Sequence, residues 1–331
     1  MKIRKKLNRA LVVLGASCVS LAVIGKASAA ITIPMVPVGN AGNAADTTGF
    51  GSVAYAYNIG QTDVTATQYT AFLNAVAKTD TYGLYNSNMA SNFAAAGISQ
   101  SGSSGSYTYA TTKNGNFPIN YVTWGDAARF ANWLTNNQPV GAEGNGTTET
   151  GSYTLNGATT DAALIAITRN ANADYVIPTE NEWYKAAYYN PASSSYYLYP
   201  TSSNTQPSNV LSATGTNNAN YYNGGYTDPT NYLTSVGAFA DTTSPYGAYD
   251  MGGDVFQWNE SVYSGSYRGL RGGSFYFYLV YLQSGFFDLD YPSNEYYFIG
   301  FRVSQVPEPA SIGVLGLGVA GMLVRRRGVG R

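Results

Sequence analysis

Two residue types are absent from almost the whole of this chain, and this restricts both its fold and its chemistry. Its 331 residues include no histidine and one cysteine, Cys18, which lies in an apolar stretch near the N-terminus. Without a second cysteine there is no intramolecular disulfide, so burial and hydrogen bonding must hold the fold. Gly15 stands where a lipoprotein signal would need a Leu-like residue. A mature form without Cys18 has no imidazole base, His-ligated iron or zinc, or thiolate nucleophile.

The first 30 residues have the three parts of a secretory signal peptide. A basic start at Lys2 to Lys6 precedes an apolar core from Leu11 to Ile24, and small residues follow it. The core is too short to span a bilayer comfortably. We expect signal peptidase to cleave after Ala29 or Ala30 and the chain to be exported.

The last segment, residues 305–331, carries a second targeting pattern. Val306-Pro307-Glu308-Pro309 precedes a glycine-rich apolar run of 15 residues, Ala310 to Val324, and a basic cluster. The basic cluster keeps its end on the cytoplasmic side, and so short a run anchors only transiently. The pattern resembles the PEP-CTERM sorting signal, which implies an exosortase as partner and a final place on the envelope surface or in the extracellular matrix of a Gram-negative bacterium. The residues expected to direct sorting are Pro307, Glu308, Pro309, Arg325, Arg326 and Arg327.

Between these signals the chain is acidic and sparsely charged. From Ile31 to Gln305, eight Lys and Arg face 18 Asp and Glu, a net charge of −10. That balance argues against a nucleic-acid backbone as partner. The body therefore suggests a protein or polysaccharide ligand rather than nucleic acid.

Three threonines mark expected helix starts. Thr65, Thr123 and Thr179 precede predicted helices with an apolar face, and Gln68 and Glu182 stand in capping-box positions. The predicted helices are residues 66–78, 124–134 and 180–188. Glu180 and Glu182 are interpreted as first-turn residues that stabilise the helix, rather than as an acid/base pair.

The rest of the body is expected to be short strands and long loops. Strands are predicted at 54–59, 175–177, 268–278 and 299–303, with Gly/Ser/Asn-rich surface loops at 97–116 and 200–232. This mixture predicts one compact α+β domain over 54–304, preceded by a lead-in at 31–53.

Six sequence blocks then appear in a fixed order. They are IG with DVT at 59–65, PINYVTW with DA at 118–127, IPTENEW at 177–183, YDMGGDVFQW at 249–258, RGGS at 271–274 and IGFR at 299–302. Their order and wording resemble the formylglycine-generating enzyme, or sulfatase-modifying factor, family. The resemblance implies a C-type-lectin-related α+β fold with little regular secondary structure.

The resemblance fails at the positions that carry the family's chemistry. Active enzymes place copper-binding cysteines three and eight residues after the RGGS serine, where this chain has Phe277 and Leu282. Neither side chain can bind copper. The sulfoxide-forming sister group needs histidines on iron, and this chain has none. We therefore expect no copper, no iron and a catalytically inactive domain.

The family also implies structural calcium. The matching positions are Asn209 and Val210 at one site, and Gly253, Val255 and Gln257 at another. The family's Asn is Asp at position 254, and its Glu is Gln at position 257, which weakens the attraction for a cation. A polar turn without metal is the alternative at both places.

An aromatic window follows Ser274. Residues 275–298 include 11 aromatics in 24 positions. If 275–278 is a strand, both its faces are aromatic, so Phe275 and Phe277 should face the core while Tyr276 and Tyr278 face solvent. Tyrosines on a surface bind well because they offer large area at low entropic cost. The predicted ligand-binding residues are Tyr276, Tyr278, Tyr281, Phe286, Phe287, Asp288 and Asp290.

Several functions fit these features. The first is an exported binding or matrix protein that presents the aromatic window, with or without a specific ligand. Another is an enzyme with a different chemistry on the same scaffold. A third is a hypervariable ligand-binding protein of a diversity-generating retroelement, since such proteins share this fold. The residue types from 275 to 291 are mostly those expected from randomised Asn codons, although a tyrosine-rich family habit gives the same pattern.

Overall fold

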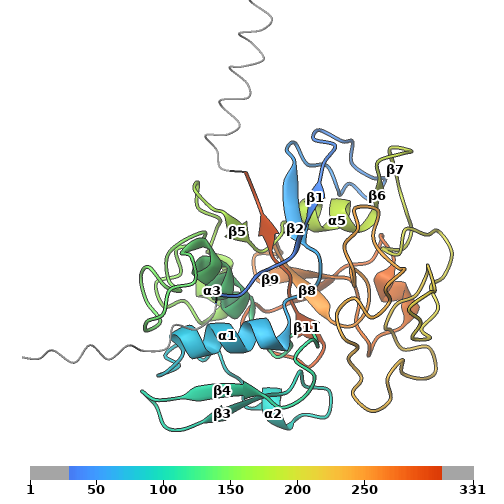
Figure 1. Cartoon of the computed structure of the whole chain (residues 1–331). Coiled ribbons are helices and arrows are strands. Elements are labelled where there is room, and N and C mark those ends of the chain that lie inside the picture. The colour runs from blue at the N-terminus through green and yellow to red at the C-terminus, as the bar shows by residue number, and fades with distance from the viewer. Residues whose placement is uncertain (1–29, 308–331) are drawn as a thin grey trace, which may run out of the picture.

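A computed structural model describes residues 30–307 (Figure 1). The expected signal peptide up to Ala29 and the sorting residues Glu308, Pro309, Arg325, Arg326 and Arg327 lie outside the described residues. The helices are α1 (Ala66–Val76), α2 (Asn88–Ser91), α3 (Trp124–Thr135), α4 (Asp161–Ile165), α5 (Glu180–Tyr188) and a 3-10 turn at Leu279–Leu282.

Two four-stranded sheets form the centre of the molecule. The first has the order β1 (Met35–Val38), β2 (Tyr57–Gly60), β12 (Ser304–Gln305), β5 (Tyr175–Val176), and all its neighbours are antiparallel. The second has the order β10 (Asp288–Asp290), β9 (Tyr267–Arg271), β8 (Phe256–Tyr263), β11 (Ile299–Gly300), with β11 parallel to β8. Two hairpins complete the sheet structure: β3 (Ile98–Ser101) with β4 (Thr108–Thr111), and β6 (Tyr189–Asn190) with β7 (Ser195–Tyr196).

The three predicted helix starts are confirmed. Thr65, Thr123 and Thr179 are N-caps of α1, α3 and α5, and each forms a complete capping box. Each hydroxyl accepts from the third helical amide while that residue's side chain accepts from the cap amide, which satisfies two otherwise unpaired donors. Helix ends in the structure lie within two residues of the predicted ones.

Three expectations about the other segments are wrong. The lead-in at 31–53 belongs to the domain, because β1 pairs with β2 and Val38 is buried in the core. The expected loop at 97–116 contains the β3–β4 hairpin. The strand expected at 268–278 ends at Arg271, because Gly272 and Gly273 have φ values of 97° and 69° that turn the chain out of the sheet.

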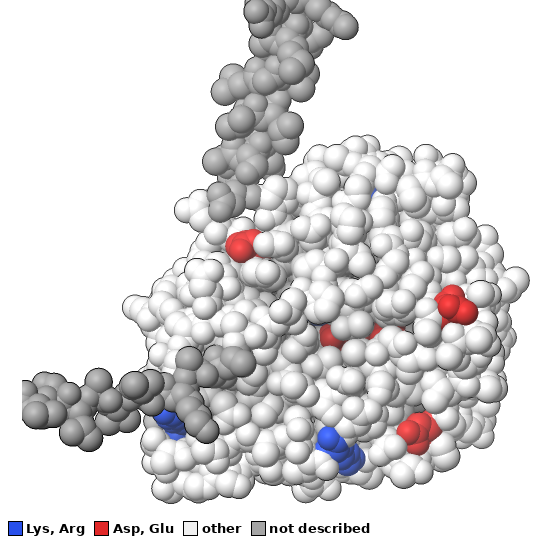
Figure 2. Space-filling model, viewed as in Figure 1, with Lys and Arg blue, Asp and Glu red and all other residues white. Residues whose placement is uncertain are grey.

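Most of the body's few basic side chains are inside the molecule. Arg129, Lys185, Arg268, Arg271 and Arg302 are buried. The face seen in Figure 2 is accordingly almost free of charge. Among residues 30–307, no helix has the length and apolar character needed to cross a bilayer.

Candidate functional site

A buried arginine at the end of the last sequence block ties several segments together. The Arg302 guanidinium donates to Gln257 Oε1 at 2.6 Å, to the Gly60 carbonyl at 2.9 Å and to Asp63 Oδ1 at 3.3 Å. It also donates to the carbonyls of Tyr249 and Asp250. These bonds join three of the six blocks, so those blocks are parts of one buried polar framework.

The RGGS block supplies a second buried arginine. Arg271 forms an ion pair with Glu180 at the start of α5, and its guanidinium also donates to the carbonyls of Ser284 and Phe286. Both side chains of the pair are almost fully buried. Arg271 therefore fixes where the chain runs after the aromatic window begins.

Glu182 has a structural role beyond capping. It accepts two hydrogen bonds from the Arg169 guanidinium, at 3.0 and 2.9 Å, and one from the Tyr55 hydroxyl. Burial raises the pKa of Glu182, but Arg169 and these bonds bring it below the ordinary value. Glu182 is thus held ionised by permanent partners, which supports the structural interpretation of this carboxylate.

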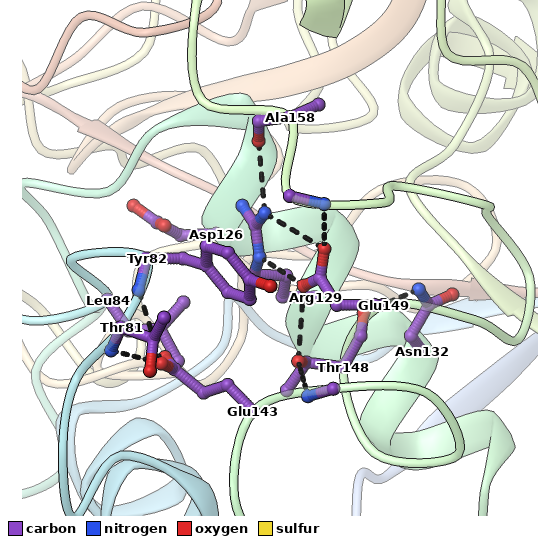
Figure 3. Close-up of polar contacts among 12 residues, drawn as sticks. Thr81, Tyr82, Leu84, Asp126, Arg129, Asn132, Glu143, Thr148, Glu149 and Ala158 are labelled. Atoms are coloured by element: carbon purple, nitrogen blue, oxygen red, sulfur yellow. Dashed lines mark hydrogen bonds and ion pairs between the residues drawn. The ribbon is translucent and has the colours of Figure 1, made fainter.

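Carboxylates gather beside a buried ion pair near the N-terminal half of α3 (Figure 3). Arg129 pairs with Glu149 at 2.7 Å, and the Tyr82 ring lies 4.5 Å from the guanidinium carbon. Burial, and then the charge of Asp80, raise the pKa of Glu143 to about 7. Among the described residues, no group of three or more carboxylates has an arrangement suited to a metal ion.

The family's cysteine positions hold apolar side chains packed among other rings. Phe277 is half-buried and lies 4.7 Å from Tyr281 and 5.1 Å from Phe298, measured between ring centroids. Leu282 is fully buried in a small cluster with Tyr199 and Tyr221. Neither offers a sulfur, nitrogen or oxygen ligand, so the residues present do not fit copper.

Exposed and half-exposed rings form a continuous patch around Tyr276, which we call the aromatic face. Tyr276 is 44% exposed, and its ring lies 5.4 Å from Tyr297 and 6.5 Å from Phe298. Tyr278 is 62% exposed and contacts Tyr222 at 5.3 Å. The aromatic face comprises Phe93, Tyr222, Tyr226, Tyr232, Tyr276, Tyr278, Tyr296, Tyr297 and Phe298.

The expected division of the window by burial is observed, although its basis in a strand is wrong. Phe275 is fully buried and Phe277 half-buried, whereas Tyr276 and Tyr278 are exposed. The segment is a loop held by two backbone bonds: the Phe275 amide donates to the Asp254 carbonyl, and the Tyr222 amide donates to the Phe277 carbonyl. The alternation therefore comes from these tethers and not from a β-ladder.

The other predicted ligand-binding residues diverge from the aromatic face. Tyr281 and Phe286, both partly buried, contact each other at 4.2 Å, and Tyr281 contacts Phe277 at 4.7 Å. Phe287 instead stacks on Tyr263 at 5.2 Å. Asp288 and Asp290 are the ends of β10, where they accept from the backbone amides that follow them. The seven residues thus form no single site, and only Tyr276 and Tyr278 belong to the aromatic face.

Four members of the aromatic face were not expected from the sequence. Phe93, 52% exposed, contacts Tyr232 at 4.8 Å, and Tyr226 contacts both Tyr222 and Tyr232. Three of them lie in the loop expected at 200–232 and one follows α2. The sequence shows tyrosines in an otherwise Gly/Asn-rich loop, which could have indicated a surface role for them. No pattern within the loop predicts that these tyrosines contact residues 276–298.

At the first expected calcium position, the Asn209 side chain meets two backbone carbonyls. The Asn209 amide nitrogen donates to the carbonyls of Tyr221 at 3.2 Å and Gly225 at 3.0 Å. Since an Asn amide can turn over, its oxygen could face the same two carbonyls around a bound ion. The Val210 carbonyl accepts from Asn218 at 3.0 Å. Asn209 would be the side-chain ligand there, with backbone carbonyls as the others.

The second expected position is less suited to a cation. Gln257 Oε1 already accepts from Trp183 Nε1 and Arg302 Nε, both at 2.6 Å, and its amide nitrogen donates to the Asp250 carbonyl. A guanidinium this close repels a second positive ion. The arrangement disfavours calcium at Gln257. The calcium site expected at Gly253, Val255 and Gln257 is thereby left without a side-chain ligand.

Asp254, in the same block, is buried and held by hydrogen bonds from uncharged groups. Its carboxyl accepts from Asn220 at 3.0 Å and from the Thr234 amide and hydroxyl at 3.0 and 2.5 Å. Burial, with the nearby Asp250 charge, raises the pKa of Asp254 to about 7. The segment from 220 to 234, which carries three rings of the aromatic face, is thereby fixed to the framework.

Comparisons with known proteins agree with this architecture. Hercynine oxygenase of Mycolicibacterium smegmatis is 31% identical over 151 residues, and that of Mycobacterium tuberculosis is 29% identical over 147 residues. Each match covers 39% of this chain and 32% of the relative, so the chain spans about a third of the length of these relatives.

Two solved structures share the fold. CarF aligns with a TM-score of 0.54 and 22% identity, covering 83% of this chain and 99% of that chain. Treponema denticola variable protein 1 aligns with a TM-score of 0.53 and 19% identity, covering 85% and 98%. The predicted α+β fold class is confirmed.

Family comparisons cover both the domain and the tail. The PEP-CTERM protein-sorting motif matches residues 305–327. It marks the chain as an exported protein that signal peptidase and an exosortase process, destined for the surface or exterior of a Gram-negative cell. The sulfatase-modifying factor enzyme 1-like domain matches residues 36–306. The chain therefore belongs to the sulfatase-modifying factor enzyme 1-like family, whose sequence blocks form its buried framework.

Proposed function

We propose that this protein is an exported, non-catalytic binding module that presents its aromatic face to a protein or polysaccharide ligand outside the cell. The observation that carries the proposal is the pairing of two features in one loop. Phe277 takes the position of a copper ligand, and the residues on either side of it, Tyr276 and Tyr278, are exposed.

The side chains present support a domain without the family's oxidative chemistry. The copper chemistry of the family uses two thiolates and its iron chemistry uses imidazoles, and the mature chain contains neither. Phe277 and Leu282 also fill the volume with apolar atoms packed against other rings. The scaffold is retained, but the two positions that hold copper ligands in the family carry the apolar side chains of Phe277 and Leu282.

The aromatic face supplies what a binding surface needs. Monomeric proteins rarely expose contiguous apolar patches unless they bind something. Tyrosine rings are rigid, offer a large contact area, and carry a hydroxyl that can form hydrogen bonds at the edge of the contact. The rings also restrain one another, since Tyr296 stacks on Phe298 at 5.1 Å with an interplanar angle of 3°. Little conformational freedom would be lost when a ligand binds.

The test measures binding of the purified mature domain to immobilised envelope material and to a panel of neutral and acidic polysaccharides. Tyr276→Ala with Tyr278→Ala should lower affinity at least about tenfold, since truncating two central aromatic contacts usually costs more than 1 kcal/mol each. Val262→Ala, at an exposed apolar residue outside the aromatic face, is the matched control. Unchanged binding by the double variant would contradict the proposal.

A second test addresses chemistry directly. The purified domain is incubated with copper and a peptide carrying a sulfatase motif, and the mass of the peptide is followed. We expect no loss of mass at the peptide cysteine. Formation of formylglycine would show that the domain is an enzyme after all.

A further inference from the structure

The sorting motif begins inside the fold, without a linker. Ser304 and Gln305 form β12, which lies between β2 and β5 in the first sheet. The next residue, Val306, donates its amide to the Asp174 carbonyl at 3.1 Å and packs against the core. Pro307 follows immediately. The first residue of the Val-Pro-Glu-Pro motif is therefore part of the folded domain.

The distance to the apolar run is correspondingly short. Only Glu308 and Pro309 separate Pro307 from Ala310, where the apolar run starts. Three residue steps span at most about 11 Å when fully extended. The polar layer on each side of a bilayer is roughly 5–8 Å thick. A membrane-embedded enzyme that acts on this motif must therefore meet the surface of the domain.

That surface has two hollows beside the departing chain. One, of about 520 Å³, is lined by residues of β1 and β2, by Ala56 just before β2, and by Asp174. The other, of about 170 Å³, is lined by Tyr55, Arg169, Asn170, Ala171 and Ala173. Val306 and Pro307 line both hollows. We call these two linings together the exit face.

We propose that the exit face is a docking surface for the membrane-embedded sorting enzyme, so that the exosortase recognises the folded domain together with the motif. β12 has a partner strand on each side, so the enzyme cannot draw more chain out of the domain without breaking the first sheet. Because Pro307 lines both hollows, they give the enzyme room to approach it. Recognition of the short motif is thereby completed by the shape of the domain around it.

The experiment follows conversion of the full-length precursor to the mature form by pulse–chase in a Gram-negative host that contains its exosortase. Ala56→Arg and Ala171→Arg place a long charged side chain at each hollow, and both positions are exposed. Each should slow conversion more than about fivefold, the effect typical of a central interface residue. Ala90→Arg, also exposed but on α2 at the far end of the molecule (Figure 1), is the matched control and should convert normally.

A second variant distinguishes loss of docking at the exit face from simple steric blocking of the motif by the arginine side chains. A ten-residue Gly/Ser insertion between Gln305 and Val306 keeps the strand and the motif but moves the motif away from the exit face. We expect slower conversion. Conversion at the normal rate or faster, or normal conversion of both arginine variants, would overturn the proposal. The arginine variants should also be converted more slowly by exosortase in detergent, where no bilayer is present. If their conversion is slow only in a bilayer, the exit face contacts lipid rather than the enzyme, and the proposal is wrong.

Two controls define the range of the assay. Glu308→Ala and replacement of Arg325, Arg326 and Arg327 alter the motif itself and should leave unprocessed or missorted protein. Thermal melting of each exit-face variant should match that of the unaltered protein. A variant that melts normally and converts slowly has lost recognition rather than folding.

Discussion

Arg271 and Tyr276 are five positions apart, yet Arg271 belongs to the buried polar framework and Tyr276 to the solvent-exposed aromatic face. Arg271 and Arg302 are fully buried, and each holds several oxygen atoms from distant segments. The aromatic face that begins at Tyr276 consists of rings that contact one another and solvent. Removing a buried guanidinium leaves its oxygen partners without donors and destabilises the fold strongly, whereas a surface ring can be exchanged for another apolar group at little cost in stability. The scaffold can therefore stay fixed while the surface beside it changes its function.

The largest effect should come from removing the arginine of the last block. Arg302→Met leaves the Asp63 carboxylate buried without its base and Gln257 with one donor fewer. We expect a loss of about 3–5 kcal/mol in the free energy of unfolding, measured by chemical denaturation. Lys78→Met, at an exposed position, is the control and should change it by less than about 0.5 kcal/mol. A loss below 1 kcal/mol for Arg302→Met would remove the contrast between framework and surface.

Phe275 and its neighbours test the boundary between the two regions. Phe275→Ala should cost about 3–5 kcal/mol because the ring is fully buried. Tyr276→Ala and Tyr278→Ala should leave the melting temperature nearly unchanged. If all three variants are equally and strongly destabilised, the window is core and the proposed ligand surface does not exist.

The sequence predicted the framework better than the aromatic face, and the reason is physical. Capping boxes are signals within four residues, so Thr65, Thr123 and Thr179 could be identified directly. Turns that end a strand were harder to anticipate, since φ at Gly272 depends on what the chain meets next. Contacts such as Phe93 with Tyr232 join segments far apart in the chain, and no local pattern encodes them.

The predictions of site residues also succeeded where the pattern was local and failed where it depended on distant contacts. Tyr276 and Tyr278 could be assigned to the surface because their identities alternate with phenylalanine. Asp288 and Asp290 could not be separated from them, because only the fold shows that β10 carries these residues along the edge of the second sheet. The ion pair of Arg271 with Glu180 was equally hidden, since 91 positions separate the partners.

The pH dependence of stability should sharpen the comparison, because burial raises the pKa of several carboxyls in the folded protein. Burial raises the pKa of Asp254 to about 7 and that of Asp250 to about 6. Burial and the Asp126 charge raise the pKa of Glu295 to about 8. A carboxyl whose pKa is higher in the folded than in the unfolded protein contributes stability that is lost as pH rises. The melting temperature should therefore fall between about pH 4 and pH 8.

Asp254→Asn isolates one contribution to this slope. The amide preserves the shape of the carboxyl and can still accept from Asn220 and the Thr234 amide, but it does not titrate. We expect a shallower fall in melting temperature between pH 5 and pH 8 than in the unaltered protein. An identical slope would mean that Asp254 is ionised in the folded state. Asp241→Asn, at an exposed carboxylate, should leave the slope unchanged.

Calcium should have the smallest effect. A weak site at Asn209 with a dissociation constant near 1 mM would stabilise the domain by about 1.4 kcal/mol in 10 mM calcium. This should appear as a modest rise in melting temperature that a chelator reverses and that Asn209→Ala abolishes. The same rise in the Asn209→Ala variant would place any bound calcium elsewhere.

The position of β12 also has a consequence for the time at which the domain folds. The first sheet joins strands from the start of the domain, β1 and β2, to β5 only through Ser304 and Gln305 at its end. During synthesis the β1–β2 pair cannot join β5 through β12 until nearly the whole chain has been made. Contacts between segments so far apart in the chain also form slowly. The first sheet therefore cannot be completed until late in synthesis. This favours export, because a domain that folded early in the cytoplasm would be harder to move across the inner membrane.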